Sequence, residues 1–344
     1  MSTSPVGSRT EAAALEVRNL SVTYPAARGR GPARAVDGVN LAIGAGEIVA
    51  LVGESGCGKS TLGRALVGLV KPTTGDVRYR GEQLVYRSGA LKRYRRHTQL
   101  VLQDPGGALN PRQNVFDAVA EGPRLHGLRE GLIERVHSAL SRAGLRPPEQ
   151  FVARYPHELS GGQQQRVVIA GALALDPSVI VADEPVASLD ASVRGEILKL
   201  ILDLRDGLGL SALVVSHDLG LAWNIADRVA VMYLGRIVEI GTVDEVLRNP
   251  QHPYTKALIA VLPDRHRDPD AARTPLGGEP PDPTAIPRGC RFHPRCPLRA
   301  SLPADDPRRS WCTDREVPVL PMHEVGGRTQ VACHLVDSSA ATPA

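Results

Sequence analysis

Three short runs of apolar residues stand out along the chain, and each of them runs into polar residues. They cover Ile48 to Val52, Val179 to Ala182 and Leu213 to Ser216. Continuous β-branched runs of this length are typical of strands that are buried on both faces of a parallel sheet. Ligands of such sheets bind beyond the carboxyl ends of the strands. The pattern therefore predicts an α/β fold with a binding site at one edge of its sheet.

The stretch between the first two of these strands carries helical signals. They extend from about Val115 to Ala174 and are interrupted at Gly127, Gly144 and the pair Pro147-Pro148, residues that commonly end helices. We interpret this stretch as a helical subdomain, over about 107–174, inserted into the sheet domain.

The composition of the sequence changes after Leu262. The stretch from Pro263 to Pro287 is rich in proline and charge and has little periodicity, which is typical of a linker or of an extended wrapping segment. A cysteine-bearing tail follows it. The predicted organisation is a flexible N-terminus over 1–14, a main domain over 15–262 and a C-terminal extension over 263–344.

The first apolar strand runs directly into a phosphate-binding loop. The residues from Gly53 to Thr61 match the pattern G-x-x-x-x-G-K-[ST], in which backbone N–H groups wrap the phosphates, the lysine reaches the outer phosphates and the next hydroxyl helps to hold Mg²⁺. The predicted nucleotide-binding residues of this loop are Gly53, Ser55, Gly56, Gly58, Lys59, Ser60 and Thr61. The chain has no internal repeat and only one such loop, so a second nucleotide site of this kind has to come from another chain.

Two acidic residues, Asp183 and Glu184, follow the second apolar strand. A carboxylate at the end of a strand beside the phosphate loop can hold Mg²⁺ opposite Ser60. We assign Asp183 and Ser60 to the metal, and Glu184 to orienting and polarising the attacking water.

A segment from Leu159 to Gln163, with the sequence Leu-Ser-Gly-Gly-Gln, comes shortly before these acids. Ser160, Gly161 and Gly162 precede a helical run that begins near Gln163, so their N–H groups and the serine hydroxyl form an anion-binding helix start. Together with the phosphate loop, this segment makes the chain resemble the ATP-binding subunits of ABC transporters. The resemblance covers about Leu15 to Leu262 and implies a P-loop NTPase (RecA-like) core with antiparallel β and helical ABC subdomains.

The resemblance also implies roles for residues that, taken alone, would not indicate a function. Tyr24 stands where the family stacks an aromatic ring on adenine, and Gln103 matches a glutamine that contacts Mg²⁺ and links the site to the helical subdomain. His217 matches a histidine that contacts the γ-phosphate. The stretch Ser188-Leu189-Asp190 matches the loop that faces the partner subunit, which adds Asp190 to the predicted nucleotide site.

In the family, the segment from Ser160 to Gln163 closes on the γ-phosphate held by the opposite subunit. The resemblance therefore implies that ATP is bound between two subunits and that its hydrolysis lets the pair reopen. We expect the isolated chain to bind ATP but to hydrolyse it poorly.

The sequence departs from the family pattern at a few positions. Gly171 replaces a common arginine, and Gln164-Gln165 replaces a more usual pairing with arginine. Neither change touches a predicted phosphate contact. Because Glu184 and His217 are both present, we expect an active ATPase rather than a regulatory module that only binds ATP.

Two segments narrow the resemblance to one branch. The stretch from Asn249 to Leu258 is similar to the segment that closes the nucleotide domain in oligopeptide, dipeptide and nickel importers. The stretch Leu109-Asn110-Pro111-Arg112 is similar to the region after the glutamine loop in peptide importers, although Gly106-Gly107 stands where an aromatic residue is common. The chain resembles most the second of the two unlike ATPases of such importers. The predicted function is to couple ATP hydrolysis to peptide uptake, with nickel or another small solute as the alternative.

This branch implies a peripheral protein on the cytoplasmic face of the membrane. Its expected partners are a different ATPase subunit, two membrane permeases and an external solute-binding protein, with a homodimer of ATPases as the alternative. The 344 residues contain no apolar run long enough to span a bilayer and no signal peptide in Met1 to Ala14. Basic residues exceed acidic ones by only 41 to 37, which gives no reason to expect nucleic acid as a partner. An ABC ATPase that acts on DNA or ribosomes is disfavoured, because no second nucleotide domain and no long coiled-coil insertion is visible.

Four of the five cysteines fall in the tail, and the fifth, Cys57, is a small residue of the phosphate loop. The tail cysteines are Cys290, Cys296, Cys312 and Cys333. In a reducing cytosol, such cysteines favour metal ligation over disulfides. The spacing lacks a C-x-x-C pair, which weakens the case for a zinc ribbon.

The tail also resembles the C-terminal extension of this importer branch, where four such cysteines can hold a [4Fe–4S] cluster. We expect that cluster to stabilise the folded tail, with zinc or unliganded thiols as alternatives. Under the zinc interpretation, His293 and His334 are back-up ligands.

Overall fold

Strand β3 (Ile48–Val52) lies inside a mixed sheet and leads into the phosphate loop. A computed structural model describes residues 13–26, 31–187, 189–260, 277–279, 281–323 and 327–336. The predicted N-terminus over 1–14 lies outside these ranges except for its last two residues. Of the predicted linker from Pro263 to Pro287, only 277–279 and 281–287 are described.

The large sheet has the strand order β11-β10-β9-β3-β8-β7-β6 in the described part of the chain. Strands β3, β6, β7, β8 and β9 pair in parallel, whereas β10 pairs antiparallel with both β9 and β11. The other strands of this sheet are β6 (Thr98–Val101), β7 (Val179–Asp183), β8 (Ser211–Ser216), β9 (Arg228–Tyr233), β10 (Arg236–Thr242) and β11 (Gln330–Val331). The three strands expected from the apolar runs are therefore confirmed as β3, β7 and β8.

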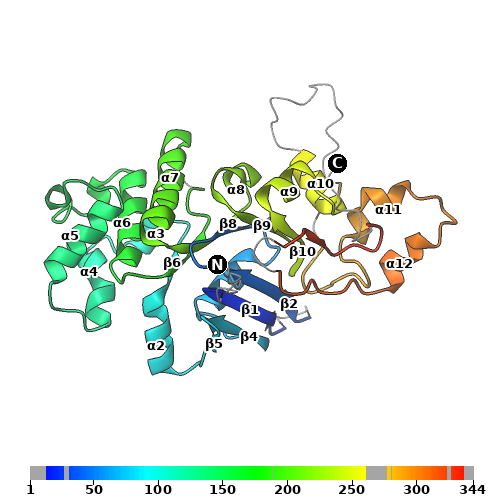
Figure 1. Cartoon of the computed structure of the whole chain (residues 1–344), viewed down its shortest axis with the longest axis horizontal. Coiled ribbons are helices and arrows are strands. Elements are labelled where there is room, and N and C mark those ends of the chain that lie inside the picture. The colour runs from blue at the N-terminus through cyan, green and yellow to red at the C-terminus, as the bar shows by residue number, and fades with distance from the viewer. Residues whose placement is uncertain are drawn as a thin grey trace, which may run out of the picture.

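A second, antiparallel sheet covers one side of the large one, with the order β2-β1-β4-β5 (Figure 1). Its strands are β1 (Leu15–Tyr24), β2 (Ala33–Ile43), β4 (Thr74–Tyr79) and β5 (Glu82–Gln83). Alternate residues of β3 point to opposite sides. Val49 and Leu51 join the core shared with this sheet and with Leu62 of α1 (Lys59–Leu66), whereas Ala50 packs toward the remaining helices.

Helices α4, α5 and α6 gather at one end of the molecule, in the stretch that predicted a helical subdomain (Figure 1). Helix α6 begins at Gly161, two residues before the expected start near Gln163. Ser160 caps it: the serine hydroxyl accepts the N–H of Gln163, and the Gln163 side chain accepts the N–H of Ser160. This reciprocal cap offsets the low helix propensity of the two glycines. The helices of this group are α4 (Val115–Leu125), α5 (Leu132–Arg142) and α6 (Gly161–Leu173), and they follow α2 (Ser88–His97) and α3 (Pro105–Ala108) along the chain.

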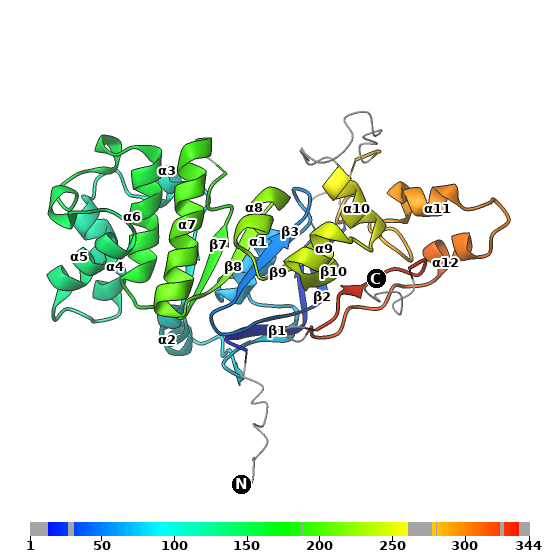
Figure 2. The ribbon, with the colours of Figure 1, turned by 45° about the horizontal axis from the view of Figure 1, so that its top comes forward.

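The segment after residue 276 extends to the opposite end of the molecule and then returns to the large sheet, where β11 pairs with β10 (Figures 1 and 2). The remaining helices are α7 (Ala191–Leu208), α8 (Leu219–Ile225), α9 (Val243–Arg248), α10 (Pro253–Ala260), α11 (Pro297–Ser301) and α12 (Arg308–Asp314). Among the described residues, no helix combines the length and the apolarity needed to cross a membrane.

Candidate functional site

The phosphate loop connects β3 to α1 and depends on glycine conformations. Gly53, Gly56 and Gly58 all have positive φ angles, and that of Gly58 is +109°. A Cβ atom at Gly58 would overlap the carbonyl oxygen of Ala35, which lies on β2. The loop can therefore pass close to β2 only because this residue has no side chain.

Lys59 begins α1 and is almost fully buried, at 6% exposure. Its Nζ donates to the carbonyl oxygens of Gly53 at 2.7 Å and Glu54 at 2.9 Å. The ammonium group is thus held inside the loop by two backbone acceptors, where it can meet an anion.

Ser60 and Asp183 lie opposite each other, as the sequence predicted. The Ser60 hydroxyl donates to Oδ1 of Asp183 at 3.0 Å. Burial raises the pKa of Asp183 above its usual range, and the hydrogen bond from Ser60 works in the opposite direction. A hydroxyl and a carboxylate at this separation supply the hard oxygen ligands that Mg²⁺ prefers.

Glu184 and His217 meet on the other side of the same cleft. Nδ1 of His217 lies 2.8 and 2.9 Å from the two carboxylate oxygens of Glu184. Glu184 has a positive φ of 51°, and its N–H donates to the carbonyl oxygen of Val215 in β8. This unusual backbone conformation, tied to the neighbouring strand, fixes the direction in which the carboxylate leaves the sheet.

A cleft of about 480 Å³ connects these groups. The residues that line it are Ala35, Ser55, Gly56, Gly58, Lys59, Ser60, Thr61, Gln103, Glu184 and His217. Gln103, from the loop after β6, therefore joins the phosphate loop, Glu184 and His217 at one place. Sequence reasoning missed Ala35, because a small residue in a strand carries no chemical signal.

Other predicted nucleotide contacts lie outside this cleft lining. Ser160, Gly161, Gly162 and Gln163 form the cap and first turn of α6, and the first two are exposed. Asp190 is exposed and immediately precedes α7, whereas Ser188 lies outside the described residues.

Tyr24 ends β1 and pairs with Ala33, two residues before the cleft residue Ala35. It is 40% exposed. A large aromatic ring is thus left partly uncovered beside the phosphate cleft.

The four tail cysteines carry free thiols. Cys290, Cys296 and Cys312 are buried, and burial raises the pKa of Cys290 to about 12 and that of Cys333 to about 11. Within the described ranges, no group of three or more His, Cys, Asp or Glu side chains is placed to hold a metal ion. The structure therefore gives the expected [4Fe–4S] cluster, and its zinc alternative, no support.

Comparison with known proteins decides the family. Residues 36–187 match the family model described as ABC transporter, and residues 238–301 match the model described as oligopeptide/dipeptide transporter, C-terminal region. A di/tripeptide transport ATP-binding protein, DppF, of Pseudomonas aeruginosa is 41% identical, over 93% of this chain and 97% of that protein. The chain belongs to the ABC transporter family.

Two further likenesses agree with this assignment. The dipeptide transport ATP-binding protein DppF of Haemophilus influenzae is 46% identical over 76% of this chain and 81% of that protein. The dimeric structure of the ATP-binding cassette MJ0796 in a post-hydrolysis state, bound to ADP and Pi, matches with a TM-score of 0.60 and 31% identity, over 67% of this chain and 98% of that one. The predicted P-loop fold and ABC-type ATPase activity are thereby confirmed.

Proposed function

We propose that this ABC ATPase is the ATP-hydrolysing subunit of an importer for peptides. The observation that carries the proposal is the single cleft that gathers Lys59, Gln103, Glu184 and His217. The peptide substrate rests on the relatives, whose names specify dipeptide and di/tripeptide transport. Those names favour peptides over nickel or another small solute.

Within this proposal, each residue of the cleft has a role that follows from its chemistry. The backbone of the phosphate loop and Lys59 hold the triphosphate, and Tyr24 stacks on adenine. Ser60, Asp183 and Gln103 would hold Mg²⁺, which neutralises phosphate charge when it is bound. Glu184 accepts a hydrogen bond from the attacking water and orients it, while His217 holds the Glu184 carboxylate and faces the γ-phosphate.

We further propose that the site is completed by a second ATPase subunit. The start of α6, with the exposed residues Ser160 and Gly161, lies outside this chain's own cleft lining. Such a helix start suits a phosphate, and the cassette MJ0796 was solved as a dimer with ADP and Pi. Asp190 and the residues from Ser160 to Gln163 would then serve the nucleotide of the partner.

The proposed assembly contains a different ATPase subunit, two permeases and an external solute-binding protein, with this chain on the cytoplasmic face of the membrane. It predicts that the isolated chain binds ATP but turns it over poorly. Brisk hydrolysis by a strict monomer would contradict the shared site.

The decisive experiment uses Glu184→Gln and Lys59→Ala in the assembled transporter. Glu184→Gln should keep MgATP binding and lower turnover by about 10²- to 10⁴-fold, because the amide cannot accept a proton. Lys59→Ala should abolish uptake of labelled peptide by weakening ATP binding. Unchanged phosphate release by Glu184→Gln would refute the role of Glu184, and uptake of nickel but not peptide by the unaltered transporter would refute the substrate.

For the tail, the [4Fe–4S] cluster stays a proposal that rests on the family resemblance and on the four cysteines alone. Anaerobic purification followed by iron and sulfide analysis tests it directly. A colourless, iron-free protein that retains one zinc per chain would replace the cluster with zinc.

A further inference from the structure

Glu54 places a carboxylate within the phosphate loop, directly after Gly53. All of its polar groups are engaged. Its carbonyl oxygen accepts from Lys59 Nζ, and its N–H donates to the hydroxyl of Tyr254 at 2.9 Å. Its two carboxylate oxygens accept from NH1 and NH2 of Arg295, at 2.8 and 2.9 Å.

Two of these partners lie far from Glu54 in the sequence. Tyr254 is the second residue of α10, and Arg295 ends a short 3₁₀ turn, His293–Arg295, in the C-terminal segment. The fork-to-fork pair between Glu54 and Arg295 bridges 241 positions of the chain. Two parallel hydrogen bonds to an ionised partner form the strongest and most directional kind of side-chain pair.

Several contacts besides Glu54 hold Arg295 in place. Its side chain is only 5% exposed, and its Nε donates to the carbonyl oxygen of Gly277 at 3.0 Å. The guanidinium lies over the ring of Tyr233, 6.0 Å from its centroid. It therefore has little freedom to leave Glu54.

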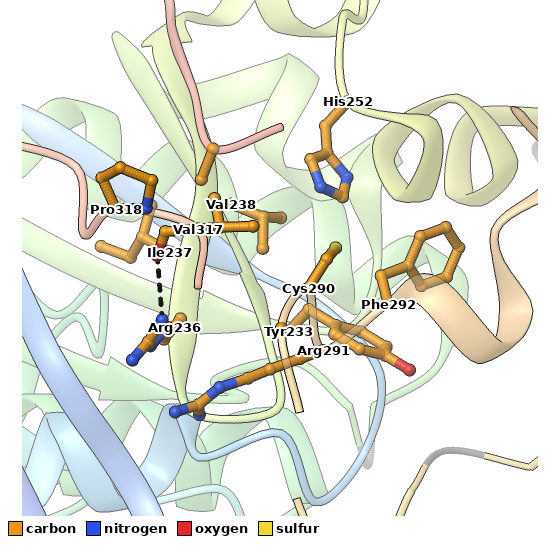
Figure 3. Close-up of a pocket in the computed structure, with 12 residues that line it drawn as sticks. Tyr233, Arg236, Ile237, Val238, His252, Cys290, Arg291, Phe292, Val317 and Pro318 are labelled. Atoms are coloured by element: carbon orange, nitrogen blue, oxygen red, sulfur yellow. Dashed lines mark hydrogen bonds between the residues drawn. The ribbon is translucent and has the colours of Figure 1, made fainter. Parts of the chain in front are cut away.

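An aromatic cluster fixes the segment that carries Arg295. Phe292 packs against Tyr233 and Tyr254, with ring centroids 5.2 and 5.4 Å apart, and these two tyrosines lie 4.6 Å from each other. Figure 3 shows Phe292 and Tyr233 beside Cys290, around a cavity of only about 20 Å³. The interface between the C-terminal segment and the sheet is thus nearly filled, as in a protein core.

A second set of hydrogen bonds connects the same segment to the phosphate loop. Arg291, next to Phe292 in Figure 3, donates to the carbonyl oxygen of Leu234 and to Asp37. The neighbouring Gly235 N–H donates to the carbonyl oxygen of Cys57, inside the phosphate loop, at 2.8 Å. The C-terminal segment therefore supports the loop from both the Glu54 and the Cys57 side.

We propose that Arg295 is a positioning residue for ATP binding that acts through Glu54. A triphosphate carries several negative charges, and an unpaired carboxylate in the loop that receives it would repel them. Arg295 offsets this charge and keeps the carboxylate turned toward the C-terminal segment. The C-terminal segment is thus part of the nucleotide site, because it sets the affinity of the phosphate loop for ATP.

The test measures MgATP binding to the full-length chain by calorimetry and turnover in the assembled transporter. Arg295→Ala should raise the Kd for MgATP by about 5- to 30-fold, while kcat at saturating ATP changes by less than about 2-fold. Glu54→Gln should bind MgATP at least as tightly as the unaltered chain. The double variant Arg295→Ala/Glu54→Gln should recover the affinity of Glu54→Gln, because the charge that Arg295 offsets is gone.

Arg308→Ala is the matched control, because it removes an exposed guanidinium from the same segment; among the described residues, Arg308 forms an ion pair with Asp306 and not with the phosphate loop. Its Kd should be unchanged. If Arg295→Ala fails to fold, Arg295→Lys replaces it, since lysine keeps the charge without the fork. Its Kd should rise by about 2- to 5-fold, and an unchanged Kd would overturn the proposal. Normal binding by Arg295→Ala, or a double variant as weak as Arg295→Ala alone, would overturn the proposal.

Discussion

The exposed ring of Tyr24 gives a prediction whose size can be worked out from the structure. The residue is 40% exposed at the end of β1, beside the strand that supplies Ala35 to the phosphate cleft. For a tyrosine with about 200 Å² of surface, that exposure corresponds to about 80 Å² that a purine can cover. At about 25 cal/mol per Å², complete cover stabilises binding by about 2 kcal/mol, and cover of one ring face by about 1 kcal/mol.

This range agrees with the 1–3 kcal/mol typical of a base stacked on an aromatic side chain. Tyr24→Ala should therefore raise the Kd for MgATP by about 5- to 30-fold at 25 °C. Tyr24→Phe should bind within about 2-fold of the unaltered chain, because the stacking surface remains.

Calorimetry with the full-length chain measures both variants. Inorganic triphosphate, which has no base, is the matched ligand, and its affinity should be the same for Tyr24→Ala and the unaltered chain. The reasoning fails if Tyr24→Ala binds MgATP normally. It also fails if Tyr24→Ala weakens triphosphate as much as ATP, since the ring would then support the loop rather than the base.

Three further predictions concern the loop, the helical region and the edge of the sheet. Gly58→Ala should abolish MgATP binding in calorimetry, because its φ of +109° and the carbonyl oxygen of Ala35 leave no place for a Cβ atom; an unchanged Kd would contradict this. Gln165 is fully buried in α6, and neither of its amide atoms is hydrogen-bonded to a described residue. Gln165→Leu should therefore raise the free energy of unfolding in urea by about 1–3 kcal/mol, and a lower urea midpoint would show that the amide is satisfied. Burial lowers the pKa of His252 to about 3; because the unfolded state binds the proton first, this residue's contribution to stability is lost as the pH falls from about 6.5 toward 3, by about 1.4 kcal/mol per unit. Between pH 7 and pH 5, the free energy of unfolding in urea should therefore fall by about 2 kcal/mol less for His252→Asn than for the unaltered chain. Equal falls would refute the lowered pKa of His252.

Much of the nucleotide core follows from local sequence. The apolar runs at β3, β7 and β8 need burial on both faces, so their length and composition alone predicted strands within a residue or two of the observed bounds. The phosphate loop was equally predictable, because only glycine adopts the positive φ angles of Gly53 and Gly58 without strain. The predicted start of α6 was two residues late, because two glycines, which have low helix propensity, follow the capping residue Ser160.

The gathering of distant side chains was decided by the tertiary structure. The resemblance suggested Gln103 and His217, but packing brings them into one cleft with Lys59. Nothing near Glu54 in the sequence points to Arg295, because a pair that bridges 241 positions leaves no local pattern. The chain's own residues therefore determined the strands and the phosphate loop through local backbone and burial preferences. Only the packing of the C-terminal segment against β9, α10 and the loop decided what surrounds that loop, because such contacts depend on the whole folded chain.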